Sequence, residues 1–273
     1  MSKFTLWSAD DAAHHLAEPG VGDDKYSRGV LGVITGSDRY PGAAVLGVEA
    51  ALRTGVGMVR YLGPDRPTDL VLQRRPEAVT SNGRVQAWLI GSGMDRADRE
   101  ADPTMQMAEA VAQQVPIVLD GGALDLYDRA AGPVVITPHY RELARLLGVT
   151  ADSIVEDPAG WARTAAGELR VTVLLKGHTT FVAGPGVSLR VQSAPSWLAT
   201  AGAGDALGGI LGALVATHSA QIMDDTALLA RLAATASLIH GLAAERASGG
   251  GPLTVLDVCA AVPATIAGLL AAG

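Results

Sequence analysis

Val30-Leu-Gly-Val-Ile-Thr35 runs into the small polar turn Gly36-Ser37, and an Ala-rich run from Gly42 to Thr54 follows. The first stretch is short, apolar and rich in β-branched residues, which predicts a buried strand. The Ala-rich run has the length and composition of a helix. A strand, a tight turn and a helix in this order predict the opening βα unit of an α/β protein.

The same alternation continues to residue 175. Strand-like runs recur at Met58 to Leu62, Ala87 to Ile90, Ile117 to Leu119, Val134 to Ile136 and Val171 to Leu175. Helices are predicted between them at Asp98 to Gln114, Tyr140 to Leu147 and Pro158 to Leu169. Strands that are apolar on both faces and separated by helices predict a doubly wound, mostly parallel sheet with helices on both faces.

The pattern changes after Lys176. Two strand-like runs, Thr179 to Ala183 and Val187 to Gln192, flank Gly184-Pro-Gly186 and predict a small β-hairpin within residues 179–192. The remainder is expected to be helical at Asp205 to Thr217, Asp224 to Arg246 and Leu256 to Leu270. Since no linker divides the chain, we expect one domain over residues 1–273, with residues 1–24 as an N-terminal extension or first helix.

Composition narrows the classes of partner. A net charge of -7 and a pI of about 5.3 argue against a nucleic-acid partner. Cys259 is the single cysteine, which excludes an internal disulfide and a Cys-based zinc cluster and fits a reducing compartment. Met1 to Asp11 shows no secretory signal, and the apolar run Leu207 to Ala216 is too short to span a bilayer. We therefore expect a cytoplasmic protein without a membrane partner.

The segment Leu198-Ala-Thr-Ala-Gly-Ala-Gly-Asp205 places a Gly-rich turn at the start of a predicted helix. A helix N-terminus presents unpaired N–H groups and positive potential, and Gly202 and Gly204 let a phosphate approach the backbone. Asp205 has two interpretations at this point. It is either an acidic residue suited to a first helical turn, or a base that removes a proton from a hydroxyl attacking a phosphoryl group.

Five polar or Gly-rich turns directly follow strand-like runs. Each fits an ordinary strand-to-helix turn, but the carboxyl ends of parallel strands share one rim, where doubly wound sheets bind ligands. A binding crevice is therefore expected there. The turns are Gly36-Ser37, Gly91-Ser-Gly93, Asp120, Thr137-Pro-His139 and Lys176-Gly177-His178.

Taken together, these segments resemble the ribokinase-like superfamily and, within it, the ADP-dependent NAD(P)H-hydrate dehydratases. The resemblance extends from about residue 25 to 215 and rests on Lys25 to Gly29, Gly36 to Ala44, Ala50 to Gly55, Ile136 to Gly148, Leu174 to Thr180 and Leu198 to Gly209. It implies a ribokinase-like fold and a lyase that repairs nicotinamide nucleotides. It also implies ADP or ATP as the phosphoryl donor, together with Mg²⁺.

Carried over position by position, the resemblance implies two groups of site residues. Those bordering the hydrated dinucleotide would be Ala43, Gly93, His139 and the catalytic Asp205. Those holding the nucleotide would be Lys176, Gly177, His178, Thr179, Thr180, Gly202, Ala203 and Gly204. Simpler roles stay open: close packing for Ala43 and Gly93, a helix start for His139, and a snorkelling strand end for Lys176. No acidic cluster identifies metal ligands.

The implied reaction begins with the hydroxyl that water leaves on the ring carbon next to the nicotinamide nitrogen. Asp205 would accept the hydroxyl proton during phosphorylation, and the ring nitrogen would then expel phosphate, so that ADP yields AMP and phosphate. Two rivals remain open. One is a kinase for a small alcohol such as a sugar or vitamin precursor, and the other is a catalytically silent nucleotide-binding protein.

The chain departs from the family pattern at three places that bear on substrate and nucleotide preference. Ser92 stands where Pro is usual, Gly122 where a second acid is usual, and Pro195-Ser-Trp197 where Asn-Pro-Gly is common. The resemblance further implies a homo-oligomer. Because no epimerase domain precedes residue 25, repair of the other epimer is expected to need a separate protein.

Overall fold

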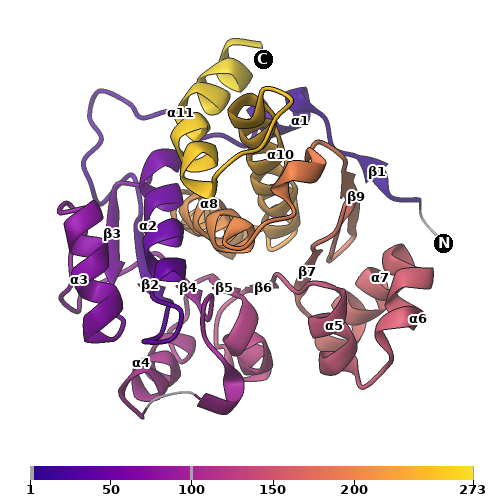
Figure 1. The fold of residues 1–273 in the computed structure, drawn as a ribbon, viewed down its shortest axis with the longest axis horizontal. Helices are drawn as coiled ribbons and strands as arrows, with labels where there is room; N and C mark the ends of the chain where they lie inside the picture. The colour runs from indigo at the N-terminus through magenta and orange to yellow at the C-terminus, as the bar shows by residue number, and fades with distance from the viewer. Residues whose placement is uncertain (1–2, 99–100, 273) are drawn as a thin grey trace.

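A nine-stranded sheet organises the computed structural model, which describes residues 3–98 and 101–272. The strand order is β1-β9-β8-β7-β6-β5-β4-β2-β3, and Figure 1 shows this sheet crossing the middle of the molecule. The strands are β1 (Thr5–Leu6), β2 (Val30–Ile34), β3 (Met58–Tyr61), β4 (Ala87–Ile90), β5 (Ile117–Leu119), β6 (Val134–Ile136), β7 (Thr172–Leu175), β8 (Thr180–Gly184) and β9 (Val187–Val191). Strands β2 to β7 are parallel, and β8 is antiparallel to both of its neighbours. The predicted mostly parallel sheet and its hairpin are confirmed.

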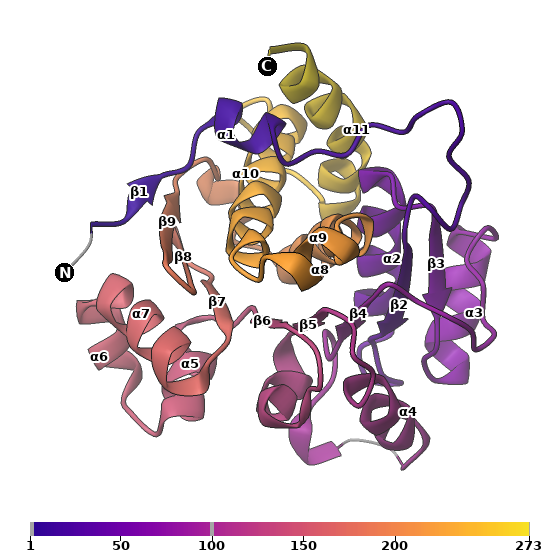
Figure 2. The same ribbon diagram turned by 180° about the vertical axis from the view of Figure 1, so that it is seen from behind.

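Helices cover both faces of this sheet, as predicted. In Figures 1 and 2, α2, α8, α10 and α11 lie on one side of the sheet and α4 to α7 on the other. The helices are α1 (Ala9–Ala13), α2 (Gly42–Thr54), α3 (Asp65–Arg74), α4 (Ala101–Val111), α5 (Tyr140–Leu147), α6 (Ala151–Glu156), α7 (Pro158–Leu169), α8 (Ala203–Thr217), α9 (Ser219–Asp224), α10 (Leu228–Ser248) and α11 (Val255–Ala272).

Strands β2 to β8 each contribute side chains to two hydrophobic cores, one on either face of the sheet. In β2, Leu31 and Val33 enter the core shared with α2, α8 and α10, whereas Val30 and Ile34 enter the core on the opposite face. Successive side chains of a strand point to opposite faces, so an all-apolar strand can stabilise both layers at once. This double burial explains why the strands read as continuous apolar runs.

Several predicted helix boundaries differ from the structure. The helix predicted over Asp224 to Arg246 is wrong at its start, because α9 ends at Asp224 and α10 begins only at Leu228. Asp225 Oδ1 accepts a hydrogen bond from the Ala227 N–H at 3.0 Å, which favours a local turn over helix continuation. The helix predicted from Asp98 crosses residues 99–100, which lie outside the described part, and α4 is described from Ala101.

The N-terminal residues contain a first helix, one of the two predicted alternatives, and a strand that the sequence pattern does not predict. Strand β1 pairs in parallel with β9, and α1 packs against α10 and α11. Ser8 caps α1: its side chain accepts from the Asp11 N–H, and the Asp11 carboxylate accepts from the Ser8 N–H. Such reciprocal capping stabilises even a short helix.

Within the described residues, α11 is the one helix that is long and apolar enough to cross a membrane by length and composition, with a mean hydropathy of 2.0. A third of it is buried, and it packs against α10 and α2. A helix of a protein core passes the same test, so we assign no membrane span to it.

Candidate functional site

The turns that follow β2 and β4 are joined at the carboxyl edge of the sheet. The Gly36 N–H donates to the Ser92 carbonyl at 2.7 Å, and Ser37 Oγ donates to the Gly93 carbonyl at 2.9 Å. Ser92 Oγ in turn reaches Asp120, which follows β5, at 2.8 Å. The shared rim predicted from the turn positions is therefore confirmed.

Asp120 is the most connected carboxylate of this rim. It is 4% exposed and accepts hydrogen bonds from Ser92, from Thr137 Oγ1 at 2.7 Å and from Lys176 Nζ at 2.7 Å. Burial acts to raise the Asp120 pKa, but the Lys176 charge and the three donors outweigh it, and the pKa lies below its ordinary value. The Asp120–Lys176 pair is consequently ionised at neutral pH.

Lys176 does not snorkel to solvent from its strand end. Burial acts to lower its pKa, but Asp120 and Glu142 outweigh burial and raise the pKa above its ordinary value. The side chain is 21% exposed, and Nζ lies 4.0 Å from Glu142 Oε2 in addition to its contact with Asp120. The ammonium is therefore a fixed positive charge beside the start of α8.

His139 does begin a helix, as the simpler interpretation holds. Its Nδ1 accepts from the N–H groups of Arg141 (3.1 Å) and Glu142 (3.2 Å), while the Glu142 carboxylate accepts from the His139 N–H at 2.8 Å. Because Nδ1 acts as an acceptor, we assign the proton of the neutral ring to Nε2. The same histidine also borders the cavity described next, so the capping role and a binding role are compatible.

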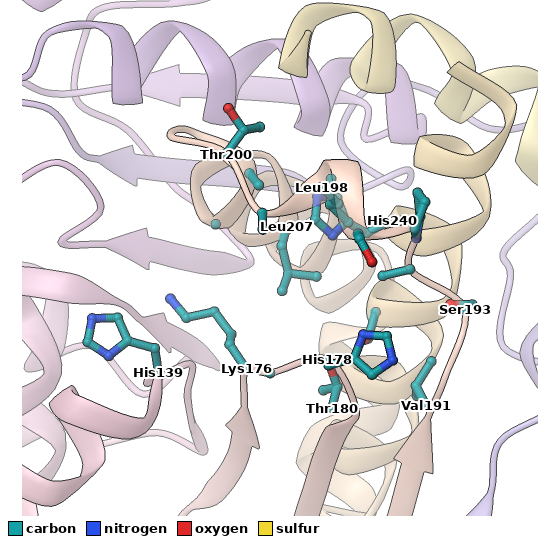
Figure 3. Close-up of a pocket in the computed structure, with 18 residues that line it drawn as sticks. His139, Lys176, His178, Thr180, Val191, Ser193, Leu198, Thr200, Leu207 and His240 are labelled. Carbon is teal, nitrogen blue, oxygen red and sulfur yellow. The ribbon is translucent and has the colours of Figure 1, made fainter. Parts of the chain in front are cut away.

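A cavity of about 720 Å³ opens between the β7–β8 turn, the segment after β9, and helices α8 and α10. This volume is within the usual range for a small-molecule site. Figure 3 shows His139 and Lys176 on one side of the cavity and Val191 and Ser193 on the other. The lining includes seven of the predicted site residues: His139, Lys176, Gly177, His178, Thr180, Ala203 and Gly204.

The start of α8 has the geometry of an anion site. Gly202 is the N-cap with φ 90°, a left-handed conformation, and a Cβ there would lie 2.5 Å from the Leu46 side chain, so glycine is required. In the described part of the chain, the N–H groups of Gly204 and Asp205 have no backbone acceptor. These free donors and the helix dipole favour a phosphate at this position.

Asp205 lies in the first turn of α8, with an unusually basic carboxylate. Burial is the largest cause of its raised pKa, the Asp120 charge adds to it, Lys176 opposes both, and the result is a pKa of about 6. Among the described residues, no side chain donates a hydrogen bond to this carboxylate. A carboxylate that is ionised at neutral pH and free to accept a proton is suited to general-base catalysis.

Asp205 and the remaining predicted site residues, Ala43, Gly93, Thr179 and Gly202, are not among the residues that line the cavity. A Cβ on Gly93 would lie 2.3 Å from the Ala43 Cβ, so close packing, the simpler role, is confirmed for this pair. Thr179 Oγ1 accepts from Gln192 Nε2 at 3.0 Å. Contacts of Ala43 and Gly93 with substrate, and of Thr179 and Gly202 with nucleotide, stay predictions.

Several lining residues were not predicted, and His240 on α10 is the most unusual of them. It is 6% exposed, and burial lowers its pKa to about 4 although the Ala203 backbone opposes the shift, so the ring is neutral. Its Nε2 has no partner among the described residues. A single histidine within an Ala/Leu-rich helix gives no sequence signal that separates it from a core residue. The other lining residues that were not predicted include Ser193, Thr200, Leu207 and Ser237.

No preformed metal centre is found in residues 3–98 and 101–272. There, no group of three or more His, Cys, Asp or Glu side chains is arranged to hold an ion. The carboxylates of the rim are instead gathered around the Lys176 ammonium.

Parallel strands β2 to β7, the antiparallel β8 beside them and the helices on both faces give the chain a ribokinase-like α/β fold. Residues 31–257 match the family model described as NAD(P)H-hydrate dehydratase. The match extends over most of the chain, and the chain belongs to that family.

Relatives of known name agree with this assignment. The chain is 34% identical to the ADP-dependent (S)-NAD(P)H-hydrate dehydratase of Neisseria meningitidis, over 69% of each chain. It is 36% identical to the bifunctional NAD(P)H-hydrate repair enzyme of Corynebacterium glutamicum, over 92% of this chain and 49% of that enzyme. The chain therefore spans about half the length of the bifunctional relatives.

A solved structure shares the fold along almost the whole chain. It is the ADP/ATP-dependent NAD(P)H-hydrate dehydratase of Bacillus subtilis, co-crystallised with ATP/Mg²⁺ and soaked with CoA. The TM-score is 0.83 at 25% identity, and the alignment covers 98% of this chain and all of that one.

Proposed function

We propose that this protein catalyses the nucleotide-dependent dehydration of (S)-NAD(P)H hydrate to NAD(P)H, with ADP as the phosphoryl donor. The observation that carries the proposal is the basic Asp205 carboxylate in the first turn of α8, next to free backbone N–H groups and the Lys176 ammonium. Support also comes from family membership and from the printed activity of the Neisseria relative.

The adenine nucleotide is proposed to occupy the 720 Å³ cavity with its phosphates directed at α8. The cavity reaches from Ser193 and His240 to Ala203 and Gly204, which gives an elongated ligand a path to the anion site. His178 and Thr180 offer polar groups along that path. The Lys176 ammonium and the α8 N–H groups would then lie against the phosphoryl group that moves.

The chemical step begins when Asp205 takes the proton of the ring hydroxyl. The hydroxyl oxygen bonds to the β-phosphorus of ADP while the bond to AMP breaks, giving a phosphorylated hydrate and AMP. The nitrogen lone pair of the ring then expels phosphate, and loss of a proton from the neighbouring ring carbon to solvent restores the reduced nicotinamide. Asp205 is required in the first half of the sequence, where it supplies general-base catalysis worth about 10²- to 10⁴-fold.

Mg²⁺ is the ion expected for phosphoryl transfer, where it neutralises charge on the phosphates. Such sites commonly take most of their ligands from the substrate phosphates and from water. The described residues, which hold no ready cluster of ligands, agree with an ion that enters with the nucleotide. No step of the mechanism above depends on a protein ligand to this ion.

A kinase for a small alcohol is the second candidate, favoured by one observation: the anion site and base would serve any hydroxyl acceptor. Product analysis separates the two. Purified protein is incubated with hydrated NADH and either ADP or ATP, and the nucleotides and dinucleotides are resolved by chromatography. Conversion of ADP to AMP with restored NADH and released phosphate supports the dehydratase. A stable phosphorylated alcohol supports a kinase, and nucleotide binding without turnover supports a silent nucleotide-binding protein.

A further inference from the structure

The Lys176 ammonium interacts with three carboxylates at the rim. Lys176 Nζ lies 2.7 Å from Asp120 Oδ1 and 4.0 Å from Glu142 Oε2, and it also interacts electrostatically with Asp205. A Cβ on Gly204 would lie 3.5 Å from Nζ, so the ammonium is adjacent to the first turn of α8. The carboxylate that holds this ammonium therefore decides how much positive charge Asp205 experiences.

Asp120 is the carboxylate best placed to hold it. Ser92 donates to Oδ2 from the turn after β4, and Thr137 donates to Oδ1 from the turn after β6. These two hydroxyls fix the orientation of the carboxylate, and the third donor, Lys176, completes it from the end of β7. Because Asp120 is almost fully buried, little water competes for the ammonium.

We propose that Asp120 is a positioning residue that holds the Lys176 ammonium at the ends of β5 and β7, and thereby keeps this charge from pairing with the Asp205 carboxylate. This inference rests on the role of Asp205 in the proposed function. In this role Asp120 does not contact the substrate. It acts by holding Lys176 and through its own negative charge. The pKa of Asp205 agrees in sign, since Asp120 raises it and Lys176 lowers it.

Few other charges lie near Asp205. Glu142 of α5 contacts Lys176, and His139 contacts Glu142. On α10, His240 is neutral. The remaining ionisable groups on the helices packed against α8 include Glu49 and Arg53 of α2, which pair with each other, and the buried Cys259 and exposed Asp257 of α11. The charges that shift the pKa of Asp205 are those of Asp120 and Lys176.

The direct test is the titration of Asp205 by NMR in full-length protein labelled with carboxyl-¹³C aspartate. The Asp205 resonance is assigned by its absence in Asp205→Asn. Replacing Asp120 by Asn removes the neighbouring negative charge and leaves the ammonium free to approach Asp205. The midpoint of the Asp205 titration should then fall by roughly 1 pH unit, as expected for an opposite charge at close range.

Two further variants separate this role from a merely structural one. Lys176→Met should move the Asp205 midpoint upward, opposite in sign to Asp120→Asn. Asp152→Asn removes an exposed carboxylate of α6 and should leave the midpoint unchanged. If circular dichroism shows that Asp120→Asn is unfolded, the direction in which Lys176→Met moves the Asp205 midpoint decides whether the inference holds.

The inference is overturned if Asp120→Asn leaves the Asp205 midpoint in place or raises it, or if Lys176→Met fails to raise it. The titration uses no substrate, so its outcome is separate from that of the activity assay. Shifted midpoints without dehydratase activity would refute the proposed function alone, whereas activity with unshifted midpoints would refute the positioning role alone.

Discussion

Replacing Asp205 by Asn should strongly reduce turnover and yet stabilise the fold. Folding raises the Asp205 pKa from 3.8 to about 6. At neutral pH the ionised carboxylate therefore destabilises the folded protein but not the unfolded chain. A difference of about two pH units corresponds to about 3 kcal/mol, and partial exposure reduces this to about 2 kcal/mol. Because no described side chain donates to the carboxylate, the isosteric amide loses no hydrogen bond.

The assay is thermal unfolding of wild type and Asp205→Asn at pH 7 and pH 4. At pH 7 the variant should melt roughly 5 °C higher, given the usual relation between free energy and Tm for a chain of this size. The sign follows from proton binding: between pH 3.8 and 6 the folded wild type holds a proton that the unfolded chain has lost, so wild-type stability falls as pH rises through that window. The gain should therefore shrink towards zero at pH 4.

Exposed Asp152 in the first turn of α6 supplies the matched control, and Asp152→Asn should not reproduce the gain at pH 7. Turnover of Asp205→Asn should fall by about 10²- to 10⁴-fold at pH 7. The difference from wild type should narrow at pH 4, where the wild-type carboxylate is protonated. The reasoning is refuted if the variant melts at or below the wild-type temperature at pH 7. It is equally refuted if an increase in Tm has the same size at pH 4.

Three further predictions extend the account. The kcat/KM of wild type should fall about tenfold between pH 7 and pH 5, because Asp205 with a pKa of about 6 becomes protonated; a flat profile in a pH-rate measurement would contradict this. Gly93→Ala should destabilise by about 2 kcal/mol more than Gly148→Ala in urea unfolding, because both glycines have φ 68° but only Gly93 would clash, with Ala43; equal losses would argue against the close contact. Glu49→Gln should lower the free energy of unfolding by roughly 3 kcal/mol in the same assay, because it leaves three arginines without their buried partner. The difference from wild type should narrow as the pH falls from 4.5 towards 2, where Glu49 becomes protonated in the wild type. Activity per folded molecule should be unchanged.

The sheet could be predicted from the sequence because its strands are buried on both faces. Such strands read as uninterrupted apolar runs, and three of them, Ala87–Ile90, Ile117–Leu119 and Val134–Ile136, have the predicted bounds. Helix α3 was harder, since Asp65–Arg74 is polar and buries only Pro67 and Val71. A short surface helix with so little apolar periodicity resembles a loop.

The chemistry of the rim could be predicted only in part. The turn positions place Asp120, His139 and Lys176 on one edge of the sheet, but the sequence does not indicate which of them pair. The Asp120–Lys176 ion pair joins residues 56 positions apart, and its partner choice depends on how β5 and β7 flank β6 in the folded sheet. The raised pKa of Asp205 depends on burial by distant elements, which no local motif records.

The most direct test of the central claim is the stoichiometry of the reaction with hydrated NADH and ADP. Absorbance of the dihydronicotinamide and chromatography of the nucleotides are followed in one sample. The account predicts one NADH restored for each AMP formed, with one phosphate released, and no restoration by Asp205→Asn. AMP or phosphorylated hydrate that accumulates without restored NADH would contradict it.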